Sequence, residues 1–288
     1  MASAVALAAK PRAGGGRLWS RARRNPMGLA ALTVLALLYL LALLGPFLYR
    51  LSPEAANPLG ILAGPSAQHW LGTDELGRDV FARILAGGRV SLTVGLLSML
   101  IGLIVGMVVG GSAGYFRGTT EAVLMRLVDV FLAIPSFFLL LVIVTVFGNH
   151  PVIVVVAVGL NFWPSMARIV FAEFSKYRGR DFVEAMHALG ASHARIMFRH
   201  ILPQVLPQAI VLATLGVGWA ILTEAALSYL GLGIQPPLAS WGNMLQNSQA
   251  YIYSNPMLAV YPGLCIALTV LAYNVLGNAL RDLLDPRD

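Results

Sequence analysis

The sequence predicts an all-α membrane protein with six transmembrane helices and both termini in the cytoplasm. Hydrophobic residues make up 58% of its 288 residues and charged residues only 11%, whereas soluble domains contain about 25% charged residues. A soluble globule this apolar could not cover its surface with polar groups. The net charge of +7 is spread thinly along the chain, which excludes a basic nucleic-acid-binding domain. Cys265 is the only cysteine, so the chain forms no intrachain disulfide and no cysteine-based metal cluster.

Long intervals without Asp, Glu, Lys or Arg locate the helices, because a spanning helix needs ~20 predominantly apolar residues. The interval 130–167 is too long for one helix, and the GNHP stretch at 148–151 divides it. The interval 225–280 is interrupted at 231–243 by glycines and prolines, which cannot continue a helix. The expected helices are 27–49, 90–115, 122–147, 151–171, 208–231 and 256–281.

The second expected helix is rich in glycine, which indicates close helix packing. Small residues at helical spacing let neighbouring backbones approach closely in lipid. We expect this packing to lie inside one bundle rather than in a dedicated dimer motif. The glycines are residues 95, 102, 106, 110, 111 and 114.

The distribution of Lys and Arg sets the orientation, because cytoplasmic segments carry an excess of these residues. The tail before the first helix has no acidic residue and contains Lys10, Arg12, Arg17, Arg21, Arg23 and Arg24. With this tail in the cytoplasm, only four of the 20 Lys and Arg residues lie outside, namely Arg50, Arg78, Arg83 and Arg89. The first apolar stretch exceeds the ~7–15 residues of a signal-peptide core, so we expect a retained first helix.

These features divide the chain into three parts. Residues 1–26 form a basic cytoplasmic tail, and residues 27–88 hold the first transmembrane helix and an extracytoplasmic loop. Residues 89–288 form a core domain of five transmembrane helices, with a long inside segment at about 172–207.

The inside segment is expected to contain two short helices. Asp181 can cap the first, with Glu184 three positions on as the partner of a capping box. Gly190 readily supplies the left-handed conformation that ends it.

Ser192 can cap the second short helix, which we expect to run to about Arg199 and to stop at Pro203 and Pro207. Two short helices with both charged and apolar residues suit a groove on a soluble partner. An amphipathic element on the membrane surface fits the same pattern, and both interpretations remain open at this point.

The inside segment resembles the "EAA" loop of ABC-importer permeases. EAMHALG at 184–190 and HILP at 200–203 follow that family's pattern and spacing, and the matching residues are Glu184, Ala185, Gly190, Leu202 and Pro203. Met186 departs from the usual Ala, and His200 stands where the general pattern prefers Ile.

Further stretches resemble the second permease of dipeptide, oligopeptide and nickel importers over roughly residues 25–287. Tyr229 and Asn278 depart from the usual Phe and Asp. The resemblance implies a type I permease fold. The stretches are LGTDELGRDVFARI at 71–84, MRLVDVFLAIPS at 125–136, EAALSYLGLGIQPPLASWG at 224–242 and NVLGNALRDLLDPR at 274–287.

The resemblance also implies a heteromeric import pump in the plasma (inner) membrane of a prokaryote. This chain would form half of the translocation pathway, beside a sister permease, two ATP-binding cassette ATPase subunits and an extracytoplasmic solute-binding protein. The loop would be a coupling helix that sits in a cleft of an ATPase. Peptides are the expected solute, and nickel or a metal chelate is the alternative.

The chain itself is expected to bind no cofactor. A P-loop needs Gly-Lys-Ser/Thr, but the only lysines, Lys10 and Lys176, follow Ala9 and Ser175. ATP and Mg²⁺ would therefore be bound by the partner ATPases.

Two charged groups outside the coupling loop are further candidates. Asp74, Glu75, Arg78 and Asp79 are expected to form a solvated outer loop with local salt bridges. The functional interpretation of Asp74, Arg78 and Asp79 is a contact for the binding protein or an outer rim of the pathway.

Inside the third expected span, Asp129 is predicted to pair with Arg126 one helical turn earlier. Pro135 and Pro164 are expected to kink their helices.

Glu224 is the one acidic residue deep in a span. A carboxylate at the bilayer centre costs of order 2.5–3.5 kcal/mol, so it should face protein or water. Val217, Ala220, Ser228 and Gly231 share a similar face. This strip suits either tight helix packing or the wall of a cavity, and we predict that Glu224 and Ser228 line the translocation pathway.

Other function classes fit the sequence less well. The histidines His69, His150, His187, His193 and His200 include no i, i+4 pair for a helical metalloprotease site. The lone Cys265 lies in an apolar stretch and is not expected to act as a nucleophile, so we expect no enzyme. A secondary transporter is the main alternative, but it would place ionisable residues in two corresponding halves.

Overall fold

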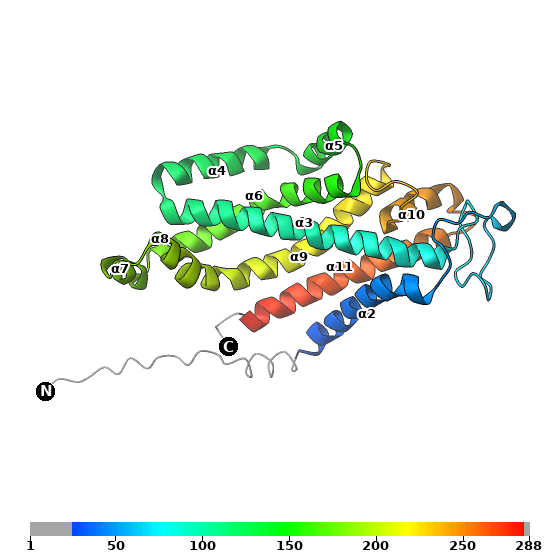
Figure 1. Ribbon diagram of the computed structural model, residues 1–288, viewed down its shortest axis with the longest axis horizontal. Coiled ribbons are helices and arrows are strands. Elements are labelled where there is room, and N and C mark those ends of the chain that lie inside the picture. Colours follow the sequence, from blue (N-terminus) through cyan, green and yellow to red (C-terminus); the bar gives the residue numbers. More distant parts are fainter. Residues whose placement is uncertain (1–24, 285–288) are drawn as a thin grey trace.

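The structure is a computed structural model that describes residues 25–284. The basic tail predicted at 1–26 lies outside the described residues except for its last two, as does Arg287. The described chain is an elongated helical bundle (Figure 1). Its α-helices are α2 (Pro26–Leu48), α3 (Val80–Phe116), α4 (Gly118–Ala133), α5 (Ser136–Phe147), α6 (Pro151–Arg178), α7 (Asp181–Ala188), α8 (His193–Arg195), α9 (Leu202–Tyr229), α10 (Trp241–Ser248) and α11 (Met257–Leu284). Among the described residues, five helical stretches are long and apolar enough to cross a membrane, and α4 and α5, counted together as one bent span, make six.

The centre of the bundle consists of α3, α6 and α9. The glycines of α3 from Gly102 to Gly114 lie against α6, and Gly95 lies against Ile221 of α9, so they serve close helix packing as the sequence predicts. A Cβ atom on Gly106 would lie 2.5 Å from Cγ of Met166, and one on Gly110 would meet the carbonyl oxygen of Ala167. The two backbones therefore approach too closely for any larger residue.

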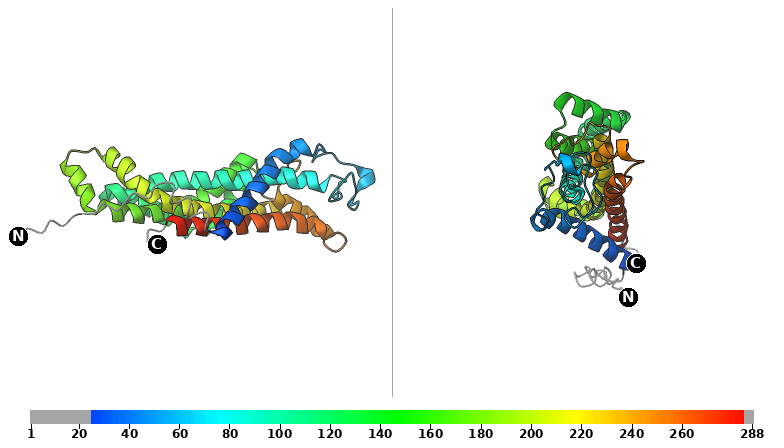
Figure 2. Two further views of the ribbon diagram at one scale, coloured as in Figure 1. Left: turned by 90° about the horizontal axis from the view of Figure 1, so that it is seen from below. Right: turned by 90° about the vertical axis from the view of Figure 1, so that its right-hand side faces the viewer.

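Helices α2 and α11 pack together along one long edge of the molecule, opposite α4 and α5 (Figures 1 and 2). Gly28 near the start of α2 lies against Ala279 near the end of α11. The hydroxyls of Tyr39 and Tyr273 join the two helices at 2.7 Å. The start of α2 and the end of α11 therefore lie at the same end of the bundle.

Helix α3 begins ten residues before the position predicted from the charge-free intervals. Asp79 caps it, because its Oδ1 accepts a hydrogen bond of 2.7 Å from the backbone N–H of Ala82. Arg83, in the first turn, is buried and paired with Asp74. A charged residue with a buried partner does not end a helix. The loop between the first two spans therefore ends at Asp79, and not at residue 89 as the expected helices 27–49 and 90–115 imply.

The third span is not the single helix predicted at 122–147. It breaks between α4 and α5, which are bent by 86° relative to one another. Pro135 has no amide proton, and it holds Ile134 in an extended conformation. Pro164, by contrast, lies inside α6, which stays helical throughout.

The predicted ion pair of Asp129 with Arg126 is wrong. Asp129 on α4 pairs with Arg168 on α6, through the Oδ1 and Nη2 atoms. Helix α4 packs against both α3 and α6, so Asp129 has a partner on another element within reach.

Candidate functional site

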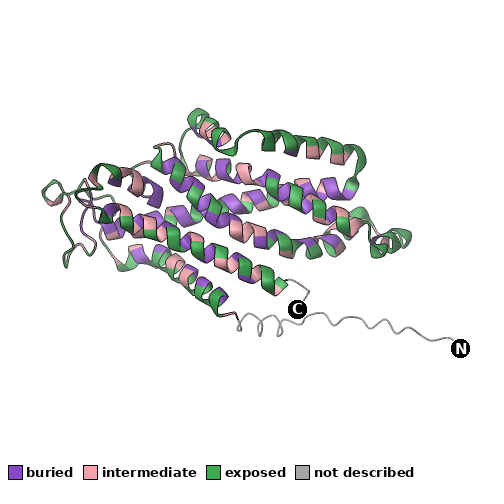
Figure 3. Ribbon diagram, turned by 180° about the vertical axis from the view of Figure 1, so that it is seen from behind, coloured by how far each residue is buried: buried purple, intermediate pink, exposed green. Residues whose placement is uncertain are grey.

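Helix α7 is exposed at one end of the bundle, and the loop of residues 49–79 lies at the opposite end (Figures 1 and 2). We call these the inner and the outer end, after the orientation predicted from the sequence. Phe182 and Glu184 are exposed, and Leu189 directly after the helix is 82% exposed. Val183 is the only buried residue of α7, and the rest of this end of the bundle is mostly exposed (Figure 3). The helix is thus anchored on one side and free on the others.

The local structure of this segment agrees with the sequence in part. Arg180, not Asp181, is the N-cap of α7, and no side chain caps the helix, so the predicted capping box does not form. Gly190 has φ +76° and ends the helix in the left-handed conformation, as predicted. Ser192 caps α8 by accepting a 3.3 Å hydrogen bond from Arg195 N–H, also as predicted.

Pro203 and Pro207 do not end the second short helix, contrary to the prediction. A π-helical turn, Ile196–Ile201, joins α8 directly to α9. The last wide hydrogen bond of this turn runs from the backbone N–H of Leu202 to the carbonyl of Met197. The next residue, Pro203, has no amide proton and donates no backbone hydrogen bond. The chain therefore enters the next span as one continuous helix.

An apolar cluster brings the two halves of the EAA-like motif together. Val183 of α7 packs in one cluster with Ile196, Ile201 and Val205. Leu202 is half-buried against this cluster. The other residues of the motif are exposed, namely Glu184, Ala185, Gly190 and Pro203.

A polar contact ties this segment to the end of α3. The hydroxyl of Tyr115 and Nδ1 of His193 lie 2.9 Å apart, and the ring of His193 also packs on that of His187, with centroids 5.3 Å apart. The guanidinium of Arg178 lies 5.9 Å from the centre of the Tyr115 ring. The side chain of Tyr115 thus links α3, α6 and α8.

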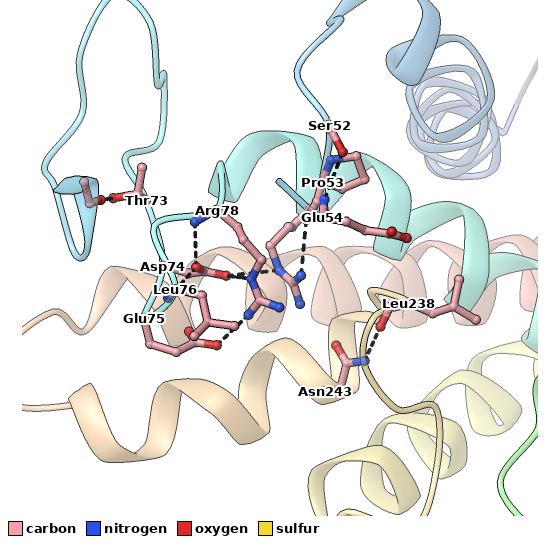
Figure 4. A network of polar contacts seen from close by, with 12 residues as sticks. Ser52, Pro53, Glu54, Thr73, Asp74, Glu75, Leu76, Arg78, Leu238 and Asn243 are labelled. Atoms are coloured by element: carbon pink, nitrogen blue, oxygen red, sulfur yellow. Dashed lines mark hydrogen bonds and ion pairs between the residues drawn. The ribbon is translucent and has the colours of Figure 1, made fainter. Parts of the chain in front are cut away.

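The charged group at the outer end is buried, which corrects the predicted solvated loop. Asp74 is 5% exposed and Arg83 1%. The Oδ2 atom of Asp74 lies 2.7 Å from Nε of Arg78 and 3.3 Å from Nε of Arg83. Arg78 also donates to Glu75 at 2.6 Å (Figure 4). One carboxylate therefore holds two arginines inside the loop.

Asp79 forms the second half of this outer structure. Besides capping α3, it accepts a 2.9 Å hydrogen bond from the hydroxyl of Tyr49 and contacts Nδ1 of His69 at 2.8 Å. Burial, helped by Asp79, raises the pKa of Tyr49 to about 12. The ring of Tyr49 also contacts Trp70 and Phe81, with centroids about 5 Å apart.

Glu224 faces protein, as expected for a carboxylate in a span. It is fully buried, and its two oxygens accept hydrogen bonds from Ser228 (2.7 Å) and Ser91 (3.0 Å). Ser91 in turn accepts from the backbone N–H of Trp241, and Ser228 from that of Ile234. Glu224 thus joins α3 and α9 to the segment that contains α10.

A cavity of about 380 Å³ lies at the break of the third span. Its wall comes from the α4–α5 junction, from α6 and from Trp219 of α9. Asn161 and Ser165 of α6 and Ser136 of α5 supply polar side chains to it. Asn161 is not among the residues predicted from the sequence, although an amide side chain in a charge-free span is a visible signal.

Known proteins share both the sequence and the fold. Residues 80–287 match the family described as the inner membrane component of binding-protein-dependent transport systems. Residues 15–65 match the N-terminal transmembrane domain of oligopeptide transport permease C.

Three curated relatives are similar over most of their length. The dipeptide transport system permease protein of Alkalihalophilus pseudofirmus is 39% identical, over 92% of this chain and 87% of the relative. The nickel transport system permease protein of Escherichia coli K12 is 41% identical over 89% and 92%. The glutathione transport system permease protein of Pectobacterium atrosepticum is 39% identical over 93% and 90%.

The fold resembles that of a chain of the methionine ABC transporter MetNI in inward-facing conformations. The TM-score is 0.56 at 20% identity, over 70% of this chain and 96% of that chain. The likeness confirms the expected type I importer permease fold.

Proposed function

This chain belongs to the family of inner membrane components of binding-protein-dependent transport systems, and from that premise we propose that it forms half of the pathway of an ATP-driven peptide importer. The match of residues 15–65 to the N-terminal domain of an oligopeptide permease carries the choice of peptide. Two of its relatives are named for dipeptide and glutathione transport, which supports the same choice.

The exposed helix α7 is the proposed contact with an ATPase subunit. Glu184 and Ala185 lie on its exposed surface. Leu202 and Pro203 are the first residues of α9, next to the apolar cluster that anchors α7. Among residues 25–284, a Cβ atom on Gly190 would meet nothing within 4 Å, which leaves room for a partner beside it. Movement of the ATPase would pass through this short connection into the spans.

The remaining parts of the proposal concern partners and topology. The chain would pair with a sister permease, two ATPase subunits and a solute-binding protein in the inner membrane, with both termini cytoplasmic. ATP and Mg²⁺ would be held by the ATPases. Residues 27–88 would hold the first transmembrane helix and an extracytoplasmic loop, and residues 89–288 would form the core permease domain.

The proposed contact with the binding protein involves Asp74, Arg78 and Asp79 only indirectly. Their side chains are buried, so they shape a loop whose surface includes Trp70, which is 58% exposed. We propose that this surface, rather than the charged groups themselves, meets the binding protein.

Import of nickel or a metal chelate is the second candidate, because the nickel permease of Escherichia coli is as similar as the peptide relatives. Titration calorimetry of the cognate binding protein with di- to hexa-alanine, glutathione and Ni²⁺ separates the two. We expect peptide binding, followed by ATP-dependent uptake of that peptide by the complex in proteoliposomes. Binding and uptake of Ni²⁺ without any peptide would reject the peptide proposal.

A further inference from the structure

The cavity at the break of the third span is bordered by two prolines. Pro135 opens α5, which begins without a side-chain cap, and Pro164 lies within α6. Neither has an amide proton, so the carbonyl of Leu160, four residues before Pro164, has no regular helical partner. Leu160 and both prolines line the cavity.

Polar side chains surround the same space. The amide nitrogen of Asn161 donates a 2.8 Å hydrogen bond to the carbonyl of Ser136, which connects α6 to the start of α5. The hydroxyls of Ser136 and Ser165 belong to the lining, and the rings of Phe162 and Trp219 lie 6.0 Å apart beside it. The cavity therefore offers hydrogen-bonding groups and aromatic surface together, as ligand sites do.

The cavity is open to one side of this chain, where Ser136 and Ser165 are exposed, and its position along the span makes these groups informative. Asn161 is ten residues along α6, about 15 Å from the start of that helix. Irregular backbone at membrane depth is tolerated only where it is buried in protein or lines an aqueous cavity. The broken span and its uncapped helix therefore do not face lipid.

The ion pair of Asp129 and Arg168 supports the same conclusion. Arg168 lies one turn beyond Pro164 towards the inner end, and both side chains are about half exposed in this chain. Charged groups facing lipid are costly, so this face of α4 and α6 meets water or a neighbouring subunit.

We propose that this cavity is a transit site where the transported peptide binds during passage. The inference rests on the proposed function. Asn161, Ser136 and the Leu160 carbonyl would hydrogen-bond the amide groups of the peptide backbone, and Trp219 would cover its side chains. Contacts to the backbone alone explain how one site accepts peptides of different sequence.

The first test replaces Asn161 by Leu, which keeps the size but removes the amide. Asn274→Leu is the matched control, because Asn274 is also an amide in a span, and it donates to Val270 on its own helix. In proteoliposomes with the complete complex and labelled di- to hexa-alanine, N161L should lower uptake about tenfold, the value of one lost polar contact. N274L should transport normally, and both should keep ATP hydrolysis stimulated by the loaded binding protein.

The second test measures how accessible the cavity is to a small reagent. It remains decisive if the N161L complex fails to assemble. With Cys265 replaced by Ser, Ser165→Cys should react with a small hydrophilic thiosulfonate, and peptide-loaded binding protein with ATP should slow the reaction. Unloaded binding protein with ATP controls for closure of the subunits, and Ser254→Cys in the outer connection before α11 controls for general access.

The outcomes separate the two proposals. The transit site alone is overturned by the following result: the unmodified complex takes up peptide, N161L and N274L take it up equally, and Ser165→Cys is labelled equally with loaded and unloaded binding protein. Absence of uptake for every alanine peptide in the unmodified complex overturns the peptide function and the transit site with it.

Discussion

The two ends of the molecule are built in opposite ways. Towards the outer end, Asp74 in the loop holds two arginines through buried ion pairs, and Glu224 in α9 joins several elements through buried hydrogen bonds. At the inner end, α7 is anchored by Val183, and the contact of Tyr115 with His193 ties its neighbour α8 to the bundle. The outer end is held together by buried polar contacts within the chain, whereas α7 at the inner end leaves most of its surface exposed. A change at the outer end should therefore affect stability, and one at the inner end should affect coupling.

Removal of the Asp74 carboxylate should have the largest effect. Asp74→Ala leaves Arg78 and Arg83 buried without their shared partner, which costs about 3–5 kcal/mol of stability. We expect a clearly lower melting temperature of the purified complex. Glu54→Gln, at an exposed carboxylate of the same loop, is the control and should melt normally. An unchanged melting temperature for D74A would show that the outer loop is not held by this residue.

Glu224 tests the second buried network and the predicted pathway role together. Glu224→Ala leaves Ser91 and Ser228 without an acceptor, at about 1–3 kcal/mol for each unsatisfied group. Glu224→Gln keeps size and hydrogen bonding but removes the charge. If Glu224 lines the pathway, both variants should reduce transport while the complex still assembles. Full transport by E224Q, with assembly lost only in E224A, would instead make the residue structural.

How far the sequence predicts this structure depends on where the decisive interaction lies. The glycines of α3 and the turn at Gly190 were predictable, because each depends on the residue itself and its immediate neighbours. The burial of Arg83 and the pairing of Asp129 with Arg168 were not, because each partner comes from a different part of the chain. Pro135 predicted a kink, but the size of the bend, and with it the cavity beside Asn161, depends on how α5 packs on α6.

Gly190 tests the inner end, where function rather than stability should respond. Gly190→Leu forces a side chain into a left-handed conformation, at about 1–2 kcal/mol, and places it where the ATPase is proposed to approach. Membrane insertion should be intact, but transport or assembly with the ATPase should be lost. Gly179→Leu, at a glycine without positive φ and with open space around it, is the control. Normal substrate-stimulated ATP hydrolysis in G190L would rule out this role.

The smallest expected change concerns the tie between α3 and α8. Tyr115→Phe removes one hydrogen bond of about 1 kcal/mol and leaves the ring in place. We expect a nearly unchanged melting temperature but fewer peptides transported per ATP hydrolysed, because α8 would follow α3 less closely. Tyr177→Phe on nearby α6 serves as the control. A melting temperature that falls without any change in this ratio would mean that Tyr115 only stabilises the fold.

The central claim is that α7 faces the cytoplasm and is covered there by an ATPase subunit. The most direct measurement uses Leu189→Cys in a chain with Cys265 replaced by Ser, because Leu189 is 82% exposed and directly follows α7. An impermeant maleimide should label this residue in inside-out vesicles stripped of the ATPase, and re-addition of the ATPase should block the labelling. Labelling in intact cells, or labelling that the ATPase does not affect, would contradict the account.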